Sequence, residues 1–470
     1  MGFLVLFTLM TSTSVIANDH SNDIEVISTS ITSEFPEAFR IKLEAQGKYD
    51  ITSIAIRLRI GQRKSGAYNY LCQPGEKVDV SKWICADLIK DKNISGELLW
   101  RTNTAARYIP PGTIITYHFE IEDSTGTILE TNPEEFIYYD SRFTWSEIVD
   151  GPVTVSYHGP VKTRAEDILD ATTKTLDHMG PLLGSGTDDP IRVTMYNNTK
   201  EMLEALPPGS TTISRELITE GQAFSELGTL LVLGGNRGAK GTASHEVTHI
   251  LVHRAGKSIY REIPSWLNEG LAEYGNIESS FSYDIALEFA AANNRLLPVM
   301  FMSGLPGKPE DVIIFYGQSK SIVNLMIDMF GTAKMAELML SFKNGNSTEN
   351  AIKEVCNLEL LELTNIWRES IGAEKYQLPD QGKSVPTPLP MREIKPFSLT
   401  EDPDAQVIGK TSSNDLSKSN GNQSKITESS KINASCNILK NGNYNALDIT
   451  IIGFLIGIAG LKFRKRVGKN

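Results

Sequence analysis

The stretch GTASHEVTHILVH, residues 241–253, contains three of the seven histidines in the chain and decides how the fold is interpreted. His245 and His249 stand four residues apart, and Glu246 follows the first of them in the pattern H-E-x-x-H. Residues four apart lie on one face of an α-helix, so both imidazoles can reach one metal ion. Glu246 faces the adjacent side, where its carboxylate can take a proton from water without binding the metal. The pattern predicts a metal-binding helix with a general base.

A catalytic metal needs a third protein ligand, and IPSWLNEGLAEYGN (263–276) supplies candidates. Pro264 fits a helix N-terminus, and Glu269 and Glu273 then share one helical face. Carboxylates on such an apolar helix are costly to bury unless they are paired or bind metal. We expect this helix to return antiparallel to the first one. Glu273 is then placed to accept the other ring N–H of a ligand histidine.

HEVTH followed by WLNEGLAEY resembles the gluzincin metallopeptidases, and most closely their peptidase MA-like branch. The resemblance covers roughly residues 150–372. It implies a zincin-type α+β domain, with a small mixed sheet plus helices, that hydrolyses peptides or proteins. It makes Glu269 the third Zn²⁺ ligand and Glu246 the general base. The strands that end in YYDSRFTW (138–145) more loosely resemble the leader domain of bacterial peptidase MA-like proteins.

The sequence departs from related enzymes in the groups that would surround the metal. It has no G-x-M-E-N exopeptidase motif, and no histidine follows His253, so another donor must stabilise the oxyanion. Tyr316, in IIFYGQSKS, is a candidate because the resemblance places a tyrosine near the site at the start of a helix. A partly buried aromatic residue at a helix start explains the same pattern equally well.

His253 and the segment 228–235 lie close to the zinc motif in the sequence. His253 continues the four-residue spacing, but each such step rotates about 40° around the helix, so three histidines cannot converge on one ion. We therefore interpret His253 as a helix-end residue. The apolar segment GTLLVLGG (228–235) is predicted as the edge strand that binds the substrate backbone. A plain core strand is the alternative, and the two roles are compatible.

Residues 24–145 predict a separate β-sandwich domain of immunoglobulin or fibronectin type, because alternating apolar segments are divided by turn signals. From about residue 150 to 372 strands alternate with helices, which indicates an α+β domain. Cys72 and Cys85 lie within the β-rich region and are candidates for a disulfide. The net charge of −11 and the pI near 5.3 argue against a nucleic-acid partner.

The two ends of the sequence predict a membrane-anchored protein. Residues 1–17 resemble a signal peptide, although Lys and Arg are missing from its start. Residues 373–445 have the composition of a disordered stalk, 446–463 are apolar enough for a short transmembrane helix, and 464–470 form a basic tail. The basic tail should stay in the cytoplasm, which places the catalytic domain outside it.

The sequence favours a cell-surface zinc metallopeptidase with His245, His249 and Glu269 as ligands. One alternative is a surface binding or adhesion protein with an inactive zincin domain. Another is a metal-dependent hydrolase that acts on something other than peptides. The sequence does not reveal the substrate, endo- or exopeptidase cleavage, or the oligomeric state.

Overall fold

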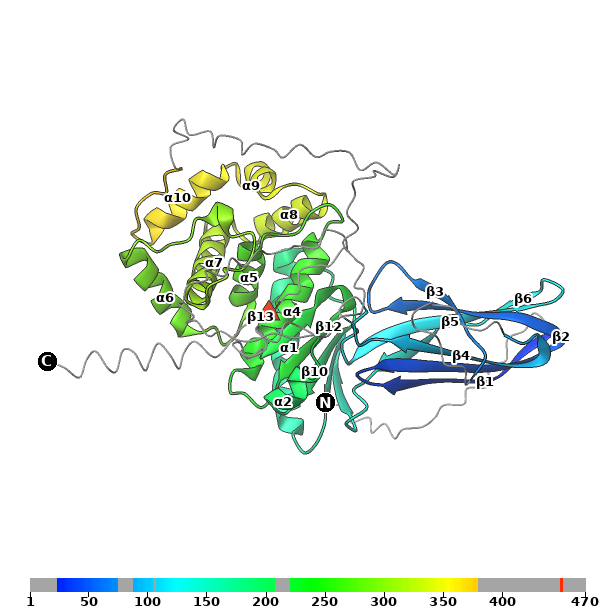
Figure 1. Cartoon of the computed structure of the whole chain (residues 1–470). Coiled ribbons are helices and arrows are strands. Elements are labelled where there is room, and N and C mark those ends of the chain that lie inside the picture. Colours follow the sequence, from blue (N-terminus) through cyan, green and yellow to red (C-terminus); the bar gives the residue numbers. More distant parts are fainter. Residues whose placement is uncertain (1–22, 75–87, 105–106, 208–219, 379–448, 451–470) are drawn as a thin grey trace, which may run out of the picture. The chain divides into compact units, whose positions relative to one another are not determined.

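A computed structural model describes residues 23–74, 88–104, 107–207, 220–378 and 449–450 (Figure 1). Over these residues, a seven-stranded antiparallel sheet is followed by a six-stranded mixed sheet and by helices, which confirms the predicted α+β class. The strands of the first sheet are β1 (Ile24–Glu34), β2 (Ala38–Ile60), β3 (Ala67–Tyr70), β4 (Asp91–Arg101), β5 (Thr113–Asp123), β6 (Ile128–Glu130) and β7 (Glu134–Tyr138).

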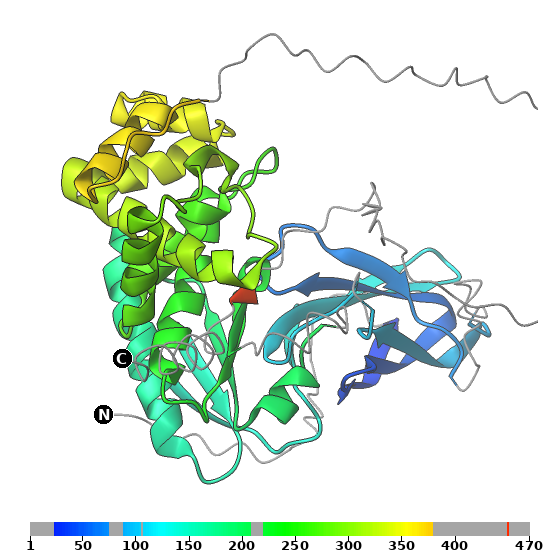
Figure 2. The ribbon, with the colours of Figure 1, turned by 60° about the vertical axis from the view of Figure 1, so that its left-hand side comes forward.

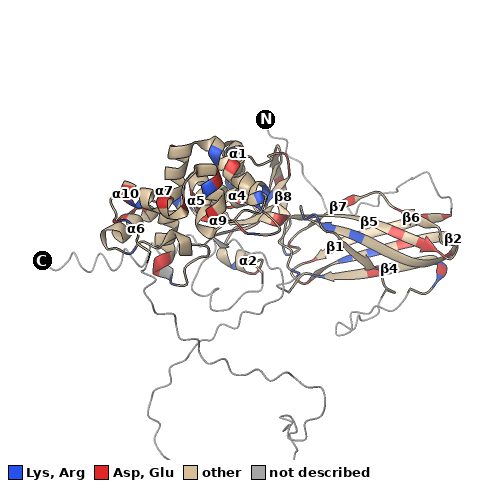
Figure 3. Cartoon of the chain, turned by 90° about the horizontal axis from the view of Figure 1, so that it is seen from above, with Lys and Arg blue, Asp and Glu red and all other residues tan. Residues whose placement is uncertain are grey.

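The long strand β2 joins the two halves of the N-terminal sheet. Its first half pairs with β1 and β4, and its second half pairs with β3 and β5. Phe39, Ile41 and Leu43 alternate with more exposed residues and are fully buried, as expected for a strand with one face on a core. Both halves of β2 contribute to the same hydrophobic cluster. The predicted β-sandwich region is therefore one hydrogen-bonded sheet, along which acidic and basic residues are interspersed (Figure 3).

The second sheet has the order β8-β9-β10-β12-β11-β13. Its strands are β8 (Ser146–Asp150), β9 (Val153–Tyr157), β10 (Ile191–Tyr196), β11 (Gly221–Phe224), β12 (Thr229–Leu233) and the two-residue β13 (Ile449–Thr450). β9, β10 and β12 are parallel, whereas β11 runs antiparallel to β12. The prediction that residues 228–235 form the edge strand is wrong, because β12 lies between β10 and β11. Both faces of β12 are buried, which explains its unbroken apolar sequence.

Helices cover one face of the mixed sheet and continue beyond it (Figures 1 and 2). The α-helices are α1 (Lys162–Leu183), α2 (Thr199–Leu203), α4 (Ala239–Gly256), α5 (Ser265–Gly275), α6 (Phe281–Ala292), α7 (Pro309–Phe330), α8 (Thr332–Lys343), α9 (Thr348–Cys356) and α10 (Leu360–Ser370). Residues with known capping preferences mark the ends of some of these helices. Gly184 ends α1 in the left-handed conformation, and the side chain of Ser347 caps the N-terminus of α9.

The two sheets share a hydrophobic core. In β12, Leu230 and Val232 pack into the cluster formed with the helices, whereas Leu231 and Leu233 pack into the cluster formed with the N-terminal sheet. The hydroxyl of Thr194 in β10 also donates a hydrogen bond of 2.8 Å to the carbonyl of Pro111. The described residues up to 376 accordingly fall within one compact unit. The two regions that the sequence presents as separate domains depend on each other for burial.

Several predicted features lie outside the described residues, namely the signal peptide (1–17), most of the stalk (373–445), the basic tail (464–470) and all but two residues of the apolar segment (446–463). Those two residues, Ile449 and Thr450, pair with β11 as β13. In the part of the chain that is described, no helix has the length and apolar character needed to cross a membrane. Cys72 is disulfide-bonded and Cys356 is free, while Cys85 and Cys436 are outside the described ranges.

Candidate active site

Helices α4 and α5 bring the two sequence motifs together because small residues allow close packing. A Cβ atom on Gly275 of α5 would lie 2.4 Å from Oγ1 of Thr248 in α4. A Cβ atom on Gly270, which follows Glu269, would lie 2.4 Å from the backbone oxygen of Ser319 in α7. Side chains at either glycine would push the helices apart. The glycine in the W-L-N-E-G segment thus serves the close contact between α5 and α7.

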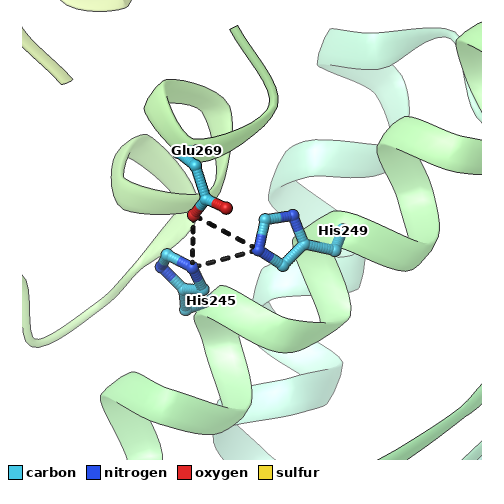
Figure 4. A group of neighbouring side chains, drawn as sticks. All are labelled: His245, His249 and Glu269. Carbon is cyan, nitrogen blue, oxygen red and sulfur yellow. Dashed lines mark hydrogen bonds and ion pairs between the residues drawn. The ribbon is translucent and has the colours of Figure 1, made fainter. Parts of the chain in front are cut away.

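The side chains of His245, His249 and Glu269 converge on one point (Figure 4). The two Nε2 atoms lie 3.1 Å apart, and Oε2 of Glu269 lies 3.3 Å from Nε2 of His245 and 3.6 Å from Nε2 of His249. Ligands bound tetrahedrally at 2.0–2.1 Å are about 3.3 Å from one another. The three atoms therefore have the spacing of one face of a zinc coordination tetrahedron.

The outer nitrogens of the two rings determine which nitrogens face the centre. Nδ1 of His245 lies 2.8 Å from Oε1 of Glu273, and Nδ1 of His249 lies 3.0 Å from Oδ1 of Asn268. Both partners are acceptors, so each Nδ1 carries the proton and each Nε2 presents a lone pair. Two lone pairs and a carboxylate oxygen facing one another repel unless a cation lies between them. The residues present fit a Zn²⁺ ion on the chemistry of their donor atoms.

The electrostatics of this group also favour positive charge. His245, His249 and Glu269 are 0%, 1% and 3% exposed. Burial alone would lower the pKa of His245, but the carboxylates of Glu269 and Glu273 raise it to about 10. Burial likewise acts to raise the pKa of Glu269, yet His249 and His245 bring it below its ordinary value. The pocket stabilises a cation among its own side chains, as a metal site does.

Glu246 lies on the adjacent side of α4, fully buried against the start of β11. A Cβ atom on Gly221 would lie 2.9 Å from Oε1 of Glu246, so only glycine leaves room for the carboxylate here. Apart from its pairing with β13, β11 is the outer strand of the mixed sheet among the described residues. The strand beside the expected general base is thus β11 and not β12, which the sequence predicts for this position.

Tyr316 is buried next to the metal group, with its ring centroid 6.2 Å from that of His245. It does not begin a helix as predicted, because α7 starts at Pro309 and Tyr316 follows two turns later. Its ring stacks on Tyr283 of α6 at 5.5 Å, and Gly317 permits this contact, since a Cβ there would lie 2.4 Å from the Tyr283 carbonyl oxygen. Burial, followed by the charge of Glu269, raises the pKa of Tyr316 well above its usual value. The phenol therefore stays protonated and can donate a hydrogen bond.

The structure also places His253, Asn268 and Tyr283. His253 lies in the last turn of α4 and is not part of the metal group, and burial lowers its pKa to about 4. Asn268 and Tyr283 were not predicted. Asn268 directly precedes Glu269 in the W-L-N-E-G segment, and this position beside a predicted ligand is the only feature of the sequence that points to it. Tyr283 lies on a helix without any motif, and only the packing of α6 on α7 reveals it.

The mixed sheet and the helices agree with the zincin-type α+β domain that the sequence predicts. The family model described as the Peptidase MA superfamily matches residues 171–373, which include all of the residues discussed above. This segment of the chain is therefore similar to that superfamily. No curated protein gives a significant match to the sequence.

Solved structures that match the chain include zinc metallopeptidases. An M1 zinc metallopeptidase from Deinococcus radiodurans is 11% identical, with 76% of this chain and 95% of that chain covered and a TM-score of 0.32. An aminopeptidase N family protein from Idiomarina loihiensis is 10% identical, with 73% and 74% covered and a TM-score of 0.34. Both TM-scores are too low to carry an argument, so the similarity rests on the family model.

Proposed function

We propose that the chain is a zinc-dependent metallopeptidase in which His245, His249 and Glu269 hold the metal. The observation that supports this most directly is the triangle of 3.1, 3.3 and 3.6 Å between two imidazole lone pairs and a carboxylate oxygen. A bound Zn²⁺ would polarise the scissile carbonyl group and lower the pKa of water at the site.

Side chains around the metal position would carry out proton transfer, stabilisation of the oxyanion and orientation of the ligands. Glu246 accepts the proton of the attacking water and passes it to the leaving amine. Tyr316, a neutral phenol, donates a hydrogen bond to the carbonyl oxygen as negative charge develops there. Glu273 and Asn268 hold the two rings so that both Nε2 atoms face the metal. The outer edge of β11, where Gly221 and Gln222 pair with β13 in this structure, would hydrogen-bond an extended substrate backbone in place of β13.

We also infer that the peptidase is anchored to a membrane with its site outside the cytoplasm. This proposal rests on the sequence alone, namely the signal-like residues 1–17, the apolar segment 446–463 and the basic residues that follow it. Protease protection of the catalytic domain in sealed vesicles tests it. If the domain is digested only after the vesicles are opened, the proposed topology is supported. If the protein is recovered in the fraction without membranes, the proposal is contradicted.

The alternatives differ in what happens at the metal. A binding protein with an inactive zincin domain would bind zinc and hydrolyse nothing. A hydrolase for other substrates would be active, but not on peptides. The buried Glu246 beside the metal group favours hydrolysis over binding alone, because an ionisable side chain is costly to bury without a role.

A metal assay combined with digestion of a peptide library tests the proposed function. The full-length chain should contain about one zinc per molecule. Glu246→Gln should keep the zinc and lose peptide hydrolysis by at least about 10²-fold. His245→Ala should lose both.

Two controls make the result specific. Glu288→Gln removes the same charge from the exposed part of α6 and should leave both zinc and hydrolysis unchanged. Stoichiometric zinc in a wild-type chain that cleaves no peptide would contradict the peptidase proposal and favour the binding protein.

A further inference from the structure

Residues 276–280 connect α5 to α6 in a polar turn, which we call the α5–α6 turn. Asn276 begins the turn, and Oδ1 of its side chain accepts a hydrogen bond of 2.9 Å from the backbone N–H of Glu278. Ser280 ends the turn and caps α6, because its side chain accepts a hydrogen bond from the backbone N–H of Ser282. The conformation of the turn is therefore stabilised by its own side chains at both ends.

The α5–α6 turn contacts one of the carboxylates of the metal site. The hydroxyl of Ser279 donates a hydrogen bond of 3.0 Å to Oε2 of Glu273, and Nδ2 of Asn276 lies 3.5 Å from the same oxygen. The other oxygen of Glu273, Oε1, lies 2.8 Å from Nδ1 of His245. The carboxylate thus connects the turn on one side with a ring of the metal group on the other.

The turn is also bound to the beginning of α4. One oxygen of Glu278 accepts a hydrogen bond of 3.3 Å from the backbone N–H of Gly241, and the other lies 3.3 Å from Nζ of Lys240. These residues belong to the first turn of α4, where backbone N–H groups have no acceptor within the helix. A Cβ atom on Gly241 would lie 2.8 Å from Oδ1 of Asn276, so glycine allows this close approach. Because His245 follows Gly241 by about one helical turn, α4 supports both the α5–α6 turn and the ring that faces the metal position.

Glu273 needs a hydrogen-bond donor on the oxygen that faces away from the ring. Its side chain is 1% exposed, and a buried carboxylate is costly unless hydrogen bonds satisfy both of its oxygens. The side chain also has several rotatable bonds, so a contact at one oxygen does not fix its orientation. Ser279 is the closer of the two donors from the turn. Without its hydroxyl the carboxylate is free to rotate away from Nδ1 of His245, which then loses the acceptor that turns Nε2 toward the metal position.

We propose that Ser279 is a positioning residue for zinc binding, which acts through Glu273 to hold the ring of His245 in the orientation that binds the metal. This inference rests on the metal site of the proposed function and adds a residue that lies outside both sequence motifs. It requires a hydroxyl group at position 279, and not merely a side chain of the right shape.

Zinc affinity, measured in the full-length chain by competition with a chelator, tests the proposal without any substrate. Ser279→Val and Ser279→Thr introduce side chains of nearly the same shape, of which only Thr keeps the hydroxyl. Ser279→Val should bind zinc roughly 10-fold more weakly than wild type, as expected when a metal ligand loses support from its hydrogen-bond partners. Ser279→Thr should bind zinc about as tightly as wild type. Ser282→Ala is the matched control, because it removes a hydroxyl that contacts Ser280, and it should not change the affinity.

A double-mutant cycle separates this role from a general effect on the fold. Ser279→Ala should weaken zinc binding as Ser279→Val does, and its smaller side chain covers the case in which the Val variant does not fold. In a chain that already carries Glu273→Ala, the change Ser279→Ala should have almost no further effect on zinc affinity, because both act through one carboxylate. Circular dichroism of the zinc-free chains shows that each variant is folded before its affinity is compared.

The possible failures are distinguishable. Wild-type affinity in Ser279→Ala, or equal losses in Ser279→Val and Ser279→Thr, would overturn the role of the hydroxyl and leave the peptidase proposal standing. The same applies if Ser279→Ala weakens zinc binding equally with and without Glu273. A wild-type chain that binds zinc but cleaves no peptide contradicts the peptidase proposal alone, since the affinities are measured without hydrolysis. A wild-type chain that binds no zinc overturns both.

Discussion

Nδ1 of His249 and Oδ1 of Asn268 are 3.0 Å apart and connect the first zinc-motif helix to the residue directly before Glu269. Because an amide oxygen only accepts, this contact fixes the proton on Nδ1 and turns the lone pair of Nε2 toward the metal position. One side chain of α5 therefore orients a ligand on α4, while its neighbour in sequence supplies a ligand itself.

Replacing Asn268 by Ala should weaken zinc binding by roughly 10- to 100-fold, because the ring of His249 loses its orienting acceptor. Competition with a zinc chelator of known affinity measures the change. Asn293→Ala, at the exposed end of α6, is the matched control and should bind zinc as wild type does. An unchanged affinity in Asn268→Ala would show that packing alone orients His249.

Gly221→Ala should reduce activity by roughly tenfold or more, because the added methyl group displaces the carboxylate of Glu246 or the edge strand. We also expect the free energy of unfolding to fall by about 1–3 kcal/mol, which is the typical effect of overpacking a protein core. Steady-state kinetics and denaturant unfolding measure the two effects. Gly238→Ala has open space around its new methyl group and should change neither. Normal activity in Gly221→Ala would argue against the role of Glu246.

Tyr283 should act on catalysis through Tyr316. Tyr283→Leu removes the stacked ring, so kcat should fall with little change in KM, whereas Tyr283→Phe keeps the ring and most of the activity. In a chain that already carries Tyr316→Phe, the change Tyr283→Leu should have almost no further effect on kcat, since both act through one phenol. Fully additive effects in this double-mutant cycle would show that the two tyrosines act independently.

The stability of the fold should depend on the ionisation of Glu220. Burial raises its pKa from an ordinary 4.5 to about 7. The folded chain then holds this proton more tightly than the unfolded chain does, so stability falls as the pH rises from about 4.5 to about 7. In the zinc-free chain, Glu220→Gln should raise the melting temperature at pH 8 by about 2 °C or more and leave it unchanged at pH 4. Equal shifts at both pH values would mean that the charge is not the cause.

The mixed sheet should not fold without the N-terminal sheet. A fragment covering 146–376 would expose Leu231, Leu233 and Phe224, which pack into the shared hydrophobic cluster. We expect this fragment to aggregate or to lack a cooperative thermal transition, while the longer fragment 23–376 melts in one step. Calorimetry and circular dichroism distinguish these outcomes. A shorter fragment that melts cooperatively would show that the two sheets are independent domains.

Helical spacing predicts that His245 and His249 share one face of a helix, and the structure places them together with Glu269. The choice of Glu269 as the third ligand came from the resemblance to gluzincins, because spacing alone puts Glu269 and Glu273 on the same face. The edge strand was assigned to the wrong segment because the four residues of β11 show no periodicity, whereas β12 has a clear apolar pattern. Asn268 and Tyr283 escaped prediction because their roles depend on the angle and distance between helices. The shared core could not be predicted either, because the sequence of an apolar strand does not indicate which elements pack on its two faces.

The covering of β12 by the N-terminal sheet has a consequence for how the chain folds during its synthesis. Ribosomes release the chain from its amino end, so residues 24–138 leave the ribosome before the zinc motif does. The support on which the edge strand rests is therefore available before the histidines and Glu269 can meet. The zinc-motif helices therefore come together only after the N-terminal sheet that covers β12 has been synthesised.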